Sequence, residues 1–314
     1  MSDKILVTGG AGFIGSWLCR ILSEQGKNVL AFDDLSTGDA SNLKDLENVE
    51  LIQGDICKDT DLKKIPWHSV KECYHLAAKG DVQESIDNPL LYSHVNIMGT
   101  HYVLEYCRQY KLSTLFMSTC MVYGFENYES RLAEGINEKF PTLPISPYGA
   151  SKLAGEQIAI SYHHSYDMSV KIARPFNTYG PYQKTNNREG GVIPLFLERK
   201  RLGKPLVVFG QGTQSRDFLY ARDCAEFLVS FMRAKNAPLI LNAGSDSTIT
   251  INDLANTISS ETGSVIHEPH PHPQSEIHCL LCDSSLARKS LGWKPQISLE
   301  DGIKENFSWL MNQV

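Results

Sequence analysis

The chain has 314 residues, of which 42% are hydrophobic and 21% are charged. A compact chain of this length buries about three quarters of the surface that it exposes when unfolded, so we expect a large apolar core. Thirty Lys and Arg against thirty-six Asp and Glu give a formal net charge of −6. Because no run of basic residues stands out, the sequence does not favour nucleic acid as a partner.

The first residues do not read as a targeting segment, since Asp3 and Lys4 lead directly into a short apolar run. No later apolar run approaches the length of a membrane span. Eight cysteines are scattered through a chain that is too large to need disulfides, which suits a reducing compartment. We therefore expect a cytoplasmic protein with free thiols and no membrane contact.

Seven short apolar runs are predicted as β-strands, and amphipathic stretches between them are predicted as helices. Strands separated by helices form a parallel, doubly wound sheet, so the expected fold class is α/β. The predicted strands span residues 4–8, 28–32, 49–53, 72–76, 115–117, 169–173 and 239–242, and the main helices span residues 13–25, 90–110 and 148–166.

A change in residue composition after Arg174, from alternating apolar runs to loop-forming residues, predicts a second, smaller lobe. Residues 175–181 read Pro-Phe-Asn-Thr-Tyr-Gly-Pro, and residues 185–191 are polar and end in glycine, both typical of loops. Residues 218–234 are predicted as the end of a strand and a helix, before the strand at 239–242 returns to the main sheet. We expect residues 1–175 and 216–243 to form the sheet domain, and residues 176–215 and 244–314 a C-terminal substrate-binding lobe.

A glycine-rich turn, Gly9-Gly10-Ala11-Gly12-Phe13-Ile14-Gly15, lies between the first predicted strand and helix. Glycines allow close approach of a pyrophosphate, and the helix start offers free N–H groups and a partial positive charge. The same glycines would also suit a tight turn without a ligand. In the strand–helix context the pattern favours a dinucleotide.

Two acidic residues, Asp33 and Asp34, end the second predicted strand, and Asp33 lies eighteen residues after Gly15. A carboxylate there accepts the ribose hydroxyls of a dinucleotide and repels a 2′-phosphate, which favours NAD over NADP. Helix capping or a solvated charge is the other interpretation. Asp55 and Ile56 follow the third strand, where they either contact the adenine or form a turn.

Tyr148 and Lys152 are four residues apart at the start of a helix that Ser146 and Pro147 begin. They share a helix face, so the ammonium of Lys152, together with an oxidised nicotinamide, would lower the pKa of the Tyr148 phenol from its usual value of about 10. Tyr148 would then act as a base towards an alcohol. The spacing alone is common on amphipathic helices, but the chain also holds the glycine turn and a Ser118-Thr119 step at a strand end.

At this point the sequence resembles the extended short-chain dehydrogenase/reductase family, specifically its NAD-dependent nucleotide-sugar epimerases and dehydratases. The resemblance implies a Rossmann fold, NAD as cofactor and a nucleotide-diphosphate sugar as substrate. It spans nearly the whole chain through residues 9–15, 33–38, 76–78, 96 with 99–100, 118–124, 146–152, 174–177, 216–218 and 291–293.

The resemblance also implies the site residues. Tyr148 is the expected base, Lys152 its electrostatic partner and ribose ligand, and Thr119 the hydroxyl that steadies the sugar oxygen, with Cys120 as a further catalytic candidate. The expected cofactor residues are Gly9, Gly12, Phe13, Ile14, Gly15, Asp33, Asp34, Ser36, Thr37, Gly38, Asp55, Ile56, Leu76, Ala77, Ala78, Asn96, Ser118, Tyr148, Lys152 and Pro175.

Substrate contacts are expected from Lys79, Glu84, Thr119, Met121, Asn177, Val192 and Arg216. Asn177 and Arg216 match positions that hold the diphosphate in the family, a role that suits a guanidinium. Arg216 would otherwise form a structural ion pair with Asp217. Lys79, Asp81 and Glu84 either line the sugar pocket or are solvated loop charges.

The choice of reaction depends on the two residues after Thr119. Dehydratases of the family carry an Asp-Glu pair there, and a decarboxylating relative keeps the Glu, whereas this chain has Cys120 and Met121. A 4-epimerase needs no additional acid or base, so we favour 4-epimerisation of a UDP-hexose or UDP-N-acetylhexosamine. The alternative is a dehydratase or a C3 or C5 epimerase that uses the Cys120 thiol as acid or base, unless Cys120 only fills space.

Other features leave alternatives open. The family's phosphate-binding Arg before Cys282-Asp283 is absent, since residues 271–276 read Pro-His-Pro-Gln-Ser-Glu. The His- and Cys-containing stretch 267–282 fits no four-ligand zinc pattern, so no metal is expected. A dinucleotide-sensing regulator is the non-enzymatic alternative, and an NADPH-dependent reductase is opposed by Asp33 and Arg216. The resemblance implies a homodimer formed through helices 90–110 and 148–166.

Overall fold

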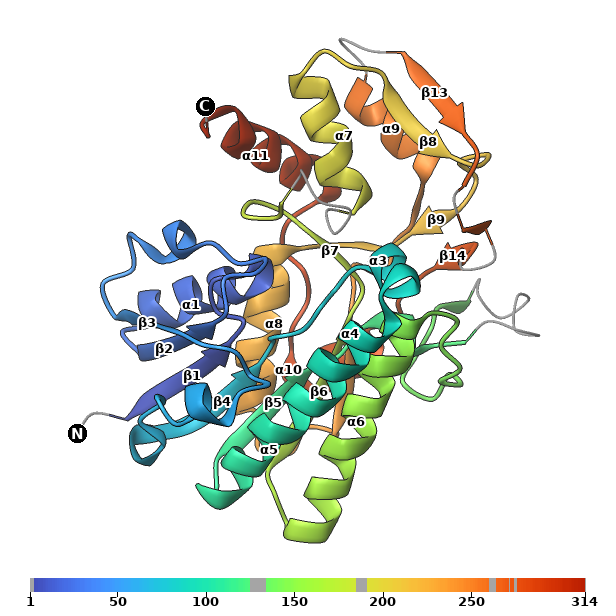
Figure 1. Cartoon of the computed structure of the whole chain (residues 1–314). Helices are drawn as coiled ribbons and strands as arrows, with labels where there is room; N and C mark the ends of the chain where they lie inside the picture. The colour runs from blue at the N-terminus through green and yellow to red at the C-terminus, as the bar shows by residue number, and fades with distance from the viewer. Residues whose placement is uncertain are drawn as a thin grey trace.

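The computed structural model describes residues 3–124, 134–184, 191–259, 264–270, 272–273 and 276–313. Two regions with sequence expectations lie outside the described residues. They are residues 185–190, expected near the start of the second lobe, and residues 271 and 274–275 of the His- and Cys-containing stretch 267–282. A seven-stranded parallel sheet forms the centre of the molecule (Figure 1). Its order is β11-β6-β5-β4-β1-β2-β3, which confirms the doubly wound α/β class.

All seven predicted strands belong to this sheet, and their ends shift by two residues at most. β1 to β3 form one half of the sheet, and β4, β5, β6 and β11 form the other half. The strands are β1 (Lys4–Thr8), β2 (Asn28–Asp33), β3 (Val49–Gln53), β4 (Val70–His75), β5 (Ser113–Met117), β6 (Val170–Pro175) and β11 (Ile240–Ala243).

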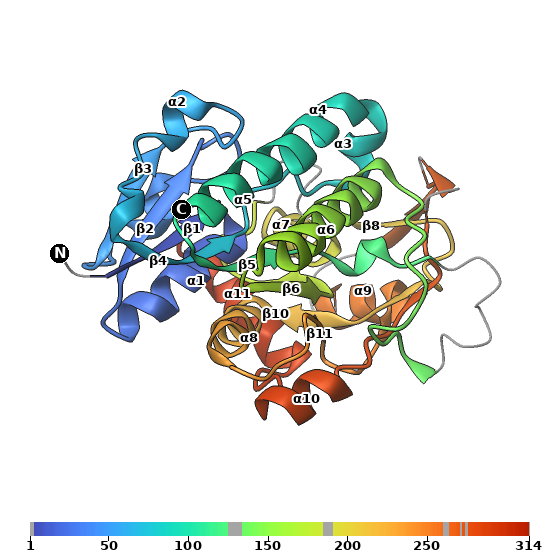
Figure 2. The same ribbon diagram turned by 90° about the horizontal axis from the view of Figure 1, so that it is seen from below.

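Helices cover both faces of the sheet, as Figure 2 shows. One face carries α1 (Phe13–Glu24), α8 (Ala221–Arg233) and α10 (Ser285–Leu291), and the other carries α4 (Pro89–Ser93), α5 (Thr100–Gln109) and α6 (Pro147–Tyr166). Alternate residues of β1 point to the two layers, since Ile5 and Val7 pack with α1 and α8 whereas Leu6 packs with α5 and α6. Both faces are therefore buried, as a parallel sheet requires.

The helix predicted over residues 90–110 is divided in the structure. Between α4 and α5 the chain forms a π-helical turn, η3 (His94–Gly99), which holds the buried Asn96. Single π-helical turns inside α-helices are frequent at functional sites. Here Asn96 bonds the backbone of Lys79 and the hydroxyl of Ser151, both close to the candidate site.

The second lobe stands above the carboxyl ends of the strands (Figure 1). Its core includes Phe196, Val208, Leu254 and Leu310. Its elements are β7 (Asn177–Tyr179), α7 (Val192–Arg201), β8 (Leu206–Phe209), β9 (Ser215–Arg216), β10 (Phe218–Tyr220), β12 (Ile249–Thr250), α9 (Ile251–Ser259), β13 (Val265–Glu268), β14 (Cys279–Leu280) and α11 (Leu299–Met311). Residues 216–243 are predicted to lie in the sheet domain, yet Phe218 and Tyr220 of β10 pack in the core of this lobe.

The remaining short elements connect the layers. They are η1 (Ala40–Leu43), α2 (Asp59–Leu62), η2 (Trp67–Ser69), α3 (Val82–Asp87) and η4 (Cys120–Val122). The helix α10 packs beside β11, and its Ala287 lies in the same buried cluster as Trp17 and Phe227 of the sheet domain.

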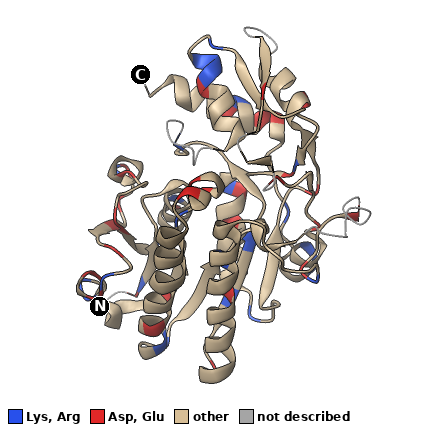
Figure 3. Cartoon of the chain, turned by 45° about the vertical axis from the view of Figure 1, so that its right-hand side comes forward, with Lys and Arg blue, Asp and Glu red and all other residues tan. Residues whose placement is uncertain are grey.

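The eight cysteines are all free. Acidic and basic residues are interspersed along the elements, apart from the basic last turn of α7, which holds Arg199, Lys200 and Arg201 (Figure 3). None of the helices in the described ranges combines the length and the apolar character that a membrane span requires.

Candidate active site

A cavity of about 510 Å³ lies at the carboxyl ends of β1, β2, β4, β5 and β6, beneath the second lobe. This is the edge where open α/β sheets bind their ligands. Most of the residues predicted for the cofactor and the chemistry line it: Gly9, Gly12, Phe13, Ile14, Gly15, Asp33, Asp34, Ser36, Thr37, Asp55, Ile56, Leu76, Ala77, Ala78, Ser118, Thr119, Cys120, Tyr148, Lys152 and Pro175. Lys79, Met121 and Asn177 from the predicted substrate set also line it.

The glycine-rich turn forms one wall of the cavity. Gly9 has a φ of +70°, which favours glycine, and a Cβ on Gly15 would collide with the Gly9 carbonyl oxygen. The turn is fixed by Asp33, whose carboxylate accepts the Ala11 N–H at 3.0 Å and the Leu35 N–H at 2.9 Å. Burial raises the pKa of this carboxyl group, and the backbone hydrogen bonds act against the rise.

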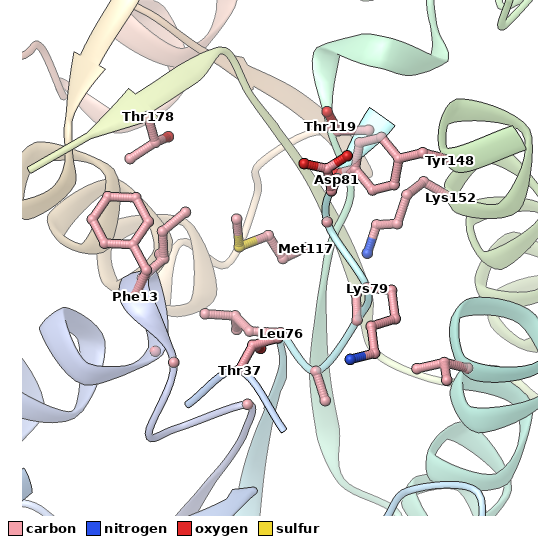
Figure 4. A pocket seen from close by; sticks show the side chains of 18 of the residues that line it. Phe13, Thr37, Leu76, Lys79, Asp81, Met117, Thr119, Tyr148, Lys152 and Thr178 are labelled. Atoms are coloured by element: carbon pink, nitrogen blue, oxygen red, sulfur yellow. The ribbon is translucent and has the colours of Figure 1, made fainter. Parts of the chain in front are cut away.

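Tyr148 and Lys152 stand on the opposite wall (Figure 4). The Ser146 hydroxyl caps α6 by accepting the Gly149 N–H at 3.1 Å, and Pro147 occupies the first turn, as the sequence predicts. Gly149 allows the helix to pack on the turn after β5, because a Cβ there would collide with the Met121 carbonyl oxygen. This close approach brings Tyr148 next to Thr119.

Burial changes the pKa values of both Lys152 and Tyr148. Burial lowers the pKa of Lys152 to about 7, and the nearby carboxylate of Glu156 acts against that change. Burial also raises the pKa of Tyr148 to about 12, with a hydrogen bond from Thr119 acting in the opposite direction. The chain alone therefore does not produce the lowered phenol pKa that the sequence pattern predicts, and additional positive charge at the site is needed to ionise Tyr148.

Cys120 lies in the cavity wall directly after Thr119, with 3% of its surface exposed. Burial raises the pKa of its thiol to about 12, while Arg216 and Thr119 act in the opposite direction. The thiol is therefore neutral near pH 7 and carries a proton that it can share. Met121, which follows it, has its N–H bonded to the Thr119 hydroxyl at 3.2 Å.

The three charged residues that follow β4, predicted as possible sugar contacts, lie in different places relative to the cavity. The Lys79 ammonium lies 3.2 Å from the Ser36 hydroxyl, and Figure 4 shows its nitrogen directed towards the Thr37 side and away from Tyr148. Glu84 lies outside the cavity lining and accepts a hydrogen bond from Tyr92 at 3.0 Å. Asp81 lines the cavity instead, on the side where Figure 4 shows Thr119 and Tyr148.

Four further candidates lie beside the cavity rather than on its lining. Gly38 packs against the Asp33 carboxylate, and Asn96 holds the Lys79 backbone through hydrogen bonds of 2.8 and 3.0 Å. Val192 begins α7, next to the lining residue Gly191. Arg216 interacts electrostatically with Cys120, and burial lowers its pKa.

The alternative ion pair between Arg216 and Asp217 is not observed among the described residues. Asp217 accepts hydrogen bonds from the Ser245 N–H at 2.7 Å, the Ser245 hydroxyl at 2.8 Å and the Cys282 N–H at 3.1 Å. Burial raises the pKa of this carboxyl group to about 6. Asn177 donates to the Asp217 carbonyl oxygen at 2.9 Å, so the two predicted diphosphate residues lie on adjacent elements.

Gln83, Tyr182, Gln183 and Lys184 line the cavity without a clear signal in the sequence, whereas Ser118 is among the predicted cofactor residues. Gln83 Oε1, Ser118 Oγ and Gln183 Oε1 are buried polar atoms on this wall with no hydrogen-bond partner in the part of the chain that the structure describes. Such atoms fit a polar ligand. Tyr182 and Lys184 also line the cavity, from a segment that reads as an ordinary loop.

The His- and Cys-containing stretch forms no metal centre in its described part. His267 bonds the Gly210 carbonyl oxygen at 2.9 Å, and Cys282 is buried near Asp217. Within the described ranges, no group of three or more His, Cys, Asp or Glu side chains is placed to hold a metal ion.

Comparison with known proteins gives the class of this site. The sequence pattern of the NAD dependent epimerase/dehydratase family matches residues 5–244. A putative UDP-glucose 4-epimerase of Methanocaldococcus jannaschii is 35% identical over 312 residues, covering 98% of both chains. The crystal structure of Pal from Bacillus thuringiensis superposes with a TM-score of 0.92 at 41% identity, covering 99% of this chain and 100% of that one.

The UDP-N-acetylglucosamine 4-epimerase of Methanobrevibacter ruminantium, solved with UDP-N-acetylmuramic acid, has a TM-score of 0.90 at 31% identity and covers 100% of both chains. The chain belongs to the NAD-dependent epimerase/dehydratase family. It is therefore an enzyme with NAD as its cofactor, which confirms the predicted family and cofactor and sets aside the regulator. The glycine turn and the unpartnered Ser118 hydroxyl fit that group.

Proposed function

We propose that the enzyme catalyses the 4-epimerisation of a nucleotide-diphosphate sugar, a UDP-hexose or UDP-N-acetylhexosamine. The glycine turn, Asp33, Ser118 and Lys152 are the residues that we assign to NAD. Asn177 and Arg216 are assigned to the diphosphate, although the arginine that the family carries before Cys282 is absent. The relative from Methanocaldococcus jannaschii, whose name is putative UDP-glucose 4-epimerase, supports this choice of substrate class.

Tyr148 removes the proton from the sugar hydroxyl at C4, and Thr119 holds the same oxygen. Bound NAD would supply hydride acceptance from C4 and its return to the opposite face of C4, and its oxidised ring would add the positive charge that the Tyr148 phenol needs to ionise. Lys152 contributes a second positive charge from below the phenol. After the 4-keto sugar turns over in the cavity, Tyr148 returns its proton and the configuration at C4 is inverted.

The observation that carries this proposal is the chemistry of the wall around Tyr148. The two positions after Thr119 hold a neutral thiol and a thioether, not the carboxylate pair of the dehydratases. Epimerisation at C4 requires a single acid–base group, which Tyr148 supplies. The cavity of about 510 Å³ is of the size that small-molecule sites require.

A second candidate is favoured by the position of Cys120. Its protonated thiol faces the cavity, and the Asp81 carboxylate lines the same cavity. A proton donor and a carboxylate together would serve proton transfer at C5 or C3, as in a dehydratase or in an epimerase at those carbons. The two candidates share the first oxidation at C4 and differ in whether a carbon-bound proton exchanges with water.

Incubation with a panel of nucleotide sugars in deuterated water, followed by NMR, distinguishes the candidates. Inversion at C4 without incorporation of deuterium supports the 4-epimerase. Deuterium at C5 or C3, or loss of water from the sugar, would replace it with the second candidate. Tyr148→Phe serves as the control for background reaction.

We also propose that two copies associate through α4, η3 and α5. Leu90 is 83% exposed, Leu91 39%, Met98 43% and Tyr102 38%, so this face carries an unusual share of exposed apolar side chains. The resemblance predicts a homodimer through helices 90–110 and 148–166, and α4, η3 and α5 correspond to the first of these ranges. Light scattering of the wild-type protein and of Leu90→Asp with Met98→Asp tests the proposal, since a wild-type monomer would refute it.

A further inference from the structure

A buried glutamate lies on the same face of α6 as the two catalytic candidates. Tyr148, Lys152 and Glu156 follow one another at intervals of four residues, so their side chains stack along the helix. Glu156 is fully buried, and Lys152 is 4% exposed. A carboxylate and an ammonium at this depth are costly unless each has an opposite charge nearby.

Glu156 is held in place by a two-point ion pair with Arg174 of β6. The guanidinium donates to the two carboxylate oxygens at 2.8 and 2.5 Å and, through its third nitrogen, to the Tyr123 hydroxyl at 3.0 Å. Tyr123 in turn donates to Asn242 of β11 at 2.6 Å. The carboxylate therefore has one fixed position between the helix and the sheet, and the charges alternate in the order Lys152, Glu156, Arg174.

The other groups that face Lys152 do not supply a negative charge to it. The ring of Phe116 on β5 lies 4.5 Å from its nitrogen. His75 of β4 is buried and neutral, because burial and the charge of Lys152 lower its pKa to about 3. Cys120 is protonated, and Asp81 lies at the cavity beyond Tyr148.

We propose that Glu156 is a positioning residue for the Tyr148 and Lys152 pair: its carboxylate, fixed by Arg174, favours the ammonium form of the buried Lys152 beside the phenol. The inference rests on the proposed role of Tyr148 and Lys152. The direction of the electrostatic effect agrees, since Glu156 opposes the lowering of the Lys152 pKa by burial. Without this carboxylate, the effect of burial on Lys152 would be unopposed, and the ammonium would lose its proton more readily.

We expect the removal of Glu156 and the removal of Arg174 to affect the pKa of Tyr148 differently. Removing the carboxylate in Glu156→Gln should neutralise Lys152 and thereby raise the pKa of Tyr148. Direct electrostatics alone would lower that pKa, because a negative charge has been removed. Removing the guanidinium in Arg174→Gln should leave Lys152 charged. The pKa of Tyr148 should therefore not rise, although a positive charge has been lost from the protein.

The test is an absorbance titration of the Tyr148 phenolate in the NAD-loaded protein, taken as the difference from the same protein carrying Tyr148→Phe. This measurement needs no sugar, so it stands even if the proposed reaction is wrong. We expect a rise of about one pH unit in the Tyr148 pKa of Glu156→Gln, and at least a tenfold lower turnover at pH 6.5, where the wild-type Lys152 carries its charge. Arg174→Gln should show no rise.

Conservative variants complete the test. Glu156→Asp keeps the negative charge, so it should raise the Tyr148 pKa less than Glu156→Gln does. Arg174→Lys keeps the positive charge and, like Arg174→Gln, should show no rise; the two conservative variants replace the neutral ones if those fail to fold. If Glu156→Gln and Arg174→Gln lose turnover equally and the Tyr148 pKa does not change, the ion pair only stabilises the packing of α6 on the sheet. That result would overturn the proposal. A lowered Tyr148 pKa in Glu156→Gln would also overturn the proposal.

Discussion

The Lys79 ammonium lies 3.2 Å from the Ser36 hydroxyl and links the loop after β4 to the loop after β2. In the sheet, β1 with its glycine turn lies between those two strands. Both residues line the cavity, and Asn96 fixes the Lys79 backbone from behind. The side chain therefore crosses the groove where the glycine turn is expected to hold a pyrophosphate.

This geometry predicts that Lys79→Met weakens the retention of NAD. We expect NAD to dissociate about tenfold faster, equivalent to about 1.4 kcal/mol, and the difference to shrink at high salt. Stopped-flow release of the dinucleotide measures the effect, with the exposed Lys71→Met as the control. A raised KM for the nucleotide sugar with unchanged NAD release would show that Lys79 contacts the sugar substrate and not NAD.

Lys152→Met should stabilise the protein without NAD while it removes activity. The pKa of Lys152 falls from its ordinary value of 10.5 to about 7 through burial, so the unfolded chain binds more protons than the folded one between these pH values. The free energy of unfolding contributed by this residue therefore rises with pH across that window and is lowest at and below pH 7.

Replacing the ammonium removes this penalty, and we expect a gain of about 1–3 kcal/mol at pH 7. Thermal unfolding of the NAD-free protein at pH 7 and pH 10 checks the sign, since the gain should shrink at the higher pH. The exposed Lys63→Met is the matched control and should change little. A lower melting temperature for Lys152→Met at pH 7 would show that the ammonium is stabilising.

Cys120→Ala separates the two proposed reactions by rate. If the enzyme is a 4-epimerase, the thiol takes no part in proton transfer, and kcat should stay within about threefold of wild type. An acid or base role would cost about 10²- to 10⁴-fold. Cys282→Ala is the matched control, because Cys282 is a buried thiol outside the cavity lining.

The apolar periodicity of the chain predicts the sheet well. All seven strands form where short apolar runs lie between turns, because a parallel sheet buries both faces and leaves a continuous signal. The division of residues 90–110 by a π-helical turn was not predicted. Its cause is the inward turn of Asn96 towards Lys79 and Ser151, a tertiary contact that helical periodicity does not record.

The site is predictable where a residue's role depends on local spacing. The glycine turn, Tyr148, Lys152 and Thr119 meet at one cavity as expected. Of the three charged candidates that follow β4, Lys79 and Asp81 line the cavity and Glu84 does not. This outcome depends on how the loop after β4 caps α3, which residue type alone does not reveal.

The most direct test of the phenol chemistry compares turnover and bound NAD in the wild type and in Tyr148→Phe. This substitution removes the hydroxyl and keeps the ring that packs 6.3 Å from Tyr92. We expect NAD to copurify at the wild-type ratio and turnover of the nucleotide sugar to fall by about 10³-fold or more. Turnover near the wild-type rate in Tyr148→Phe with NAD still bound would show that another group removes the sugar proton.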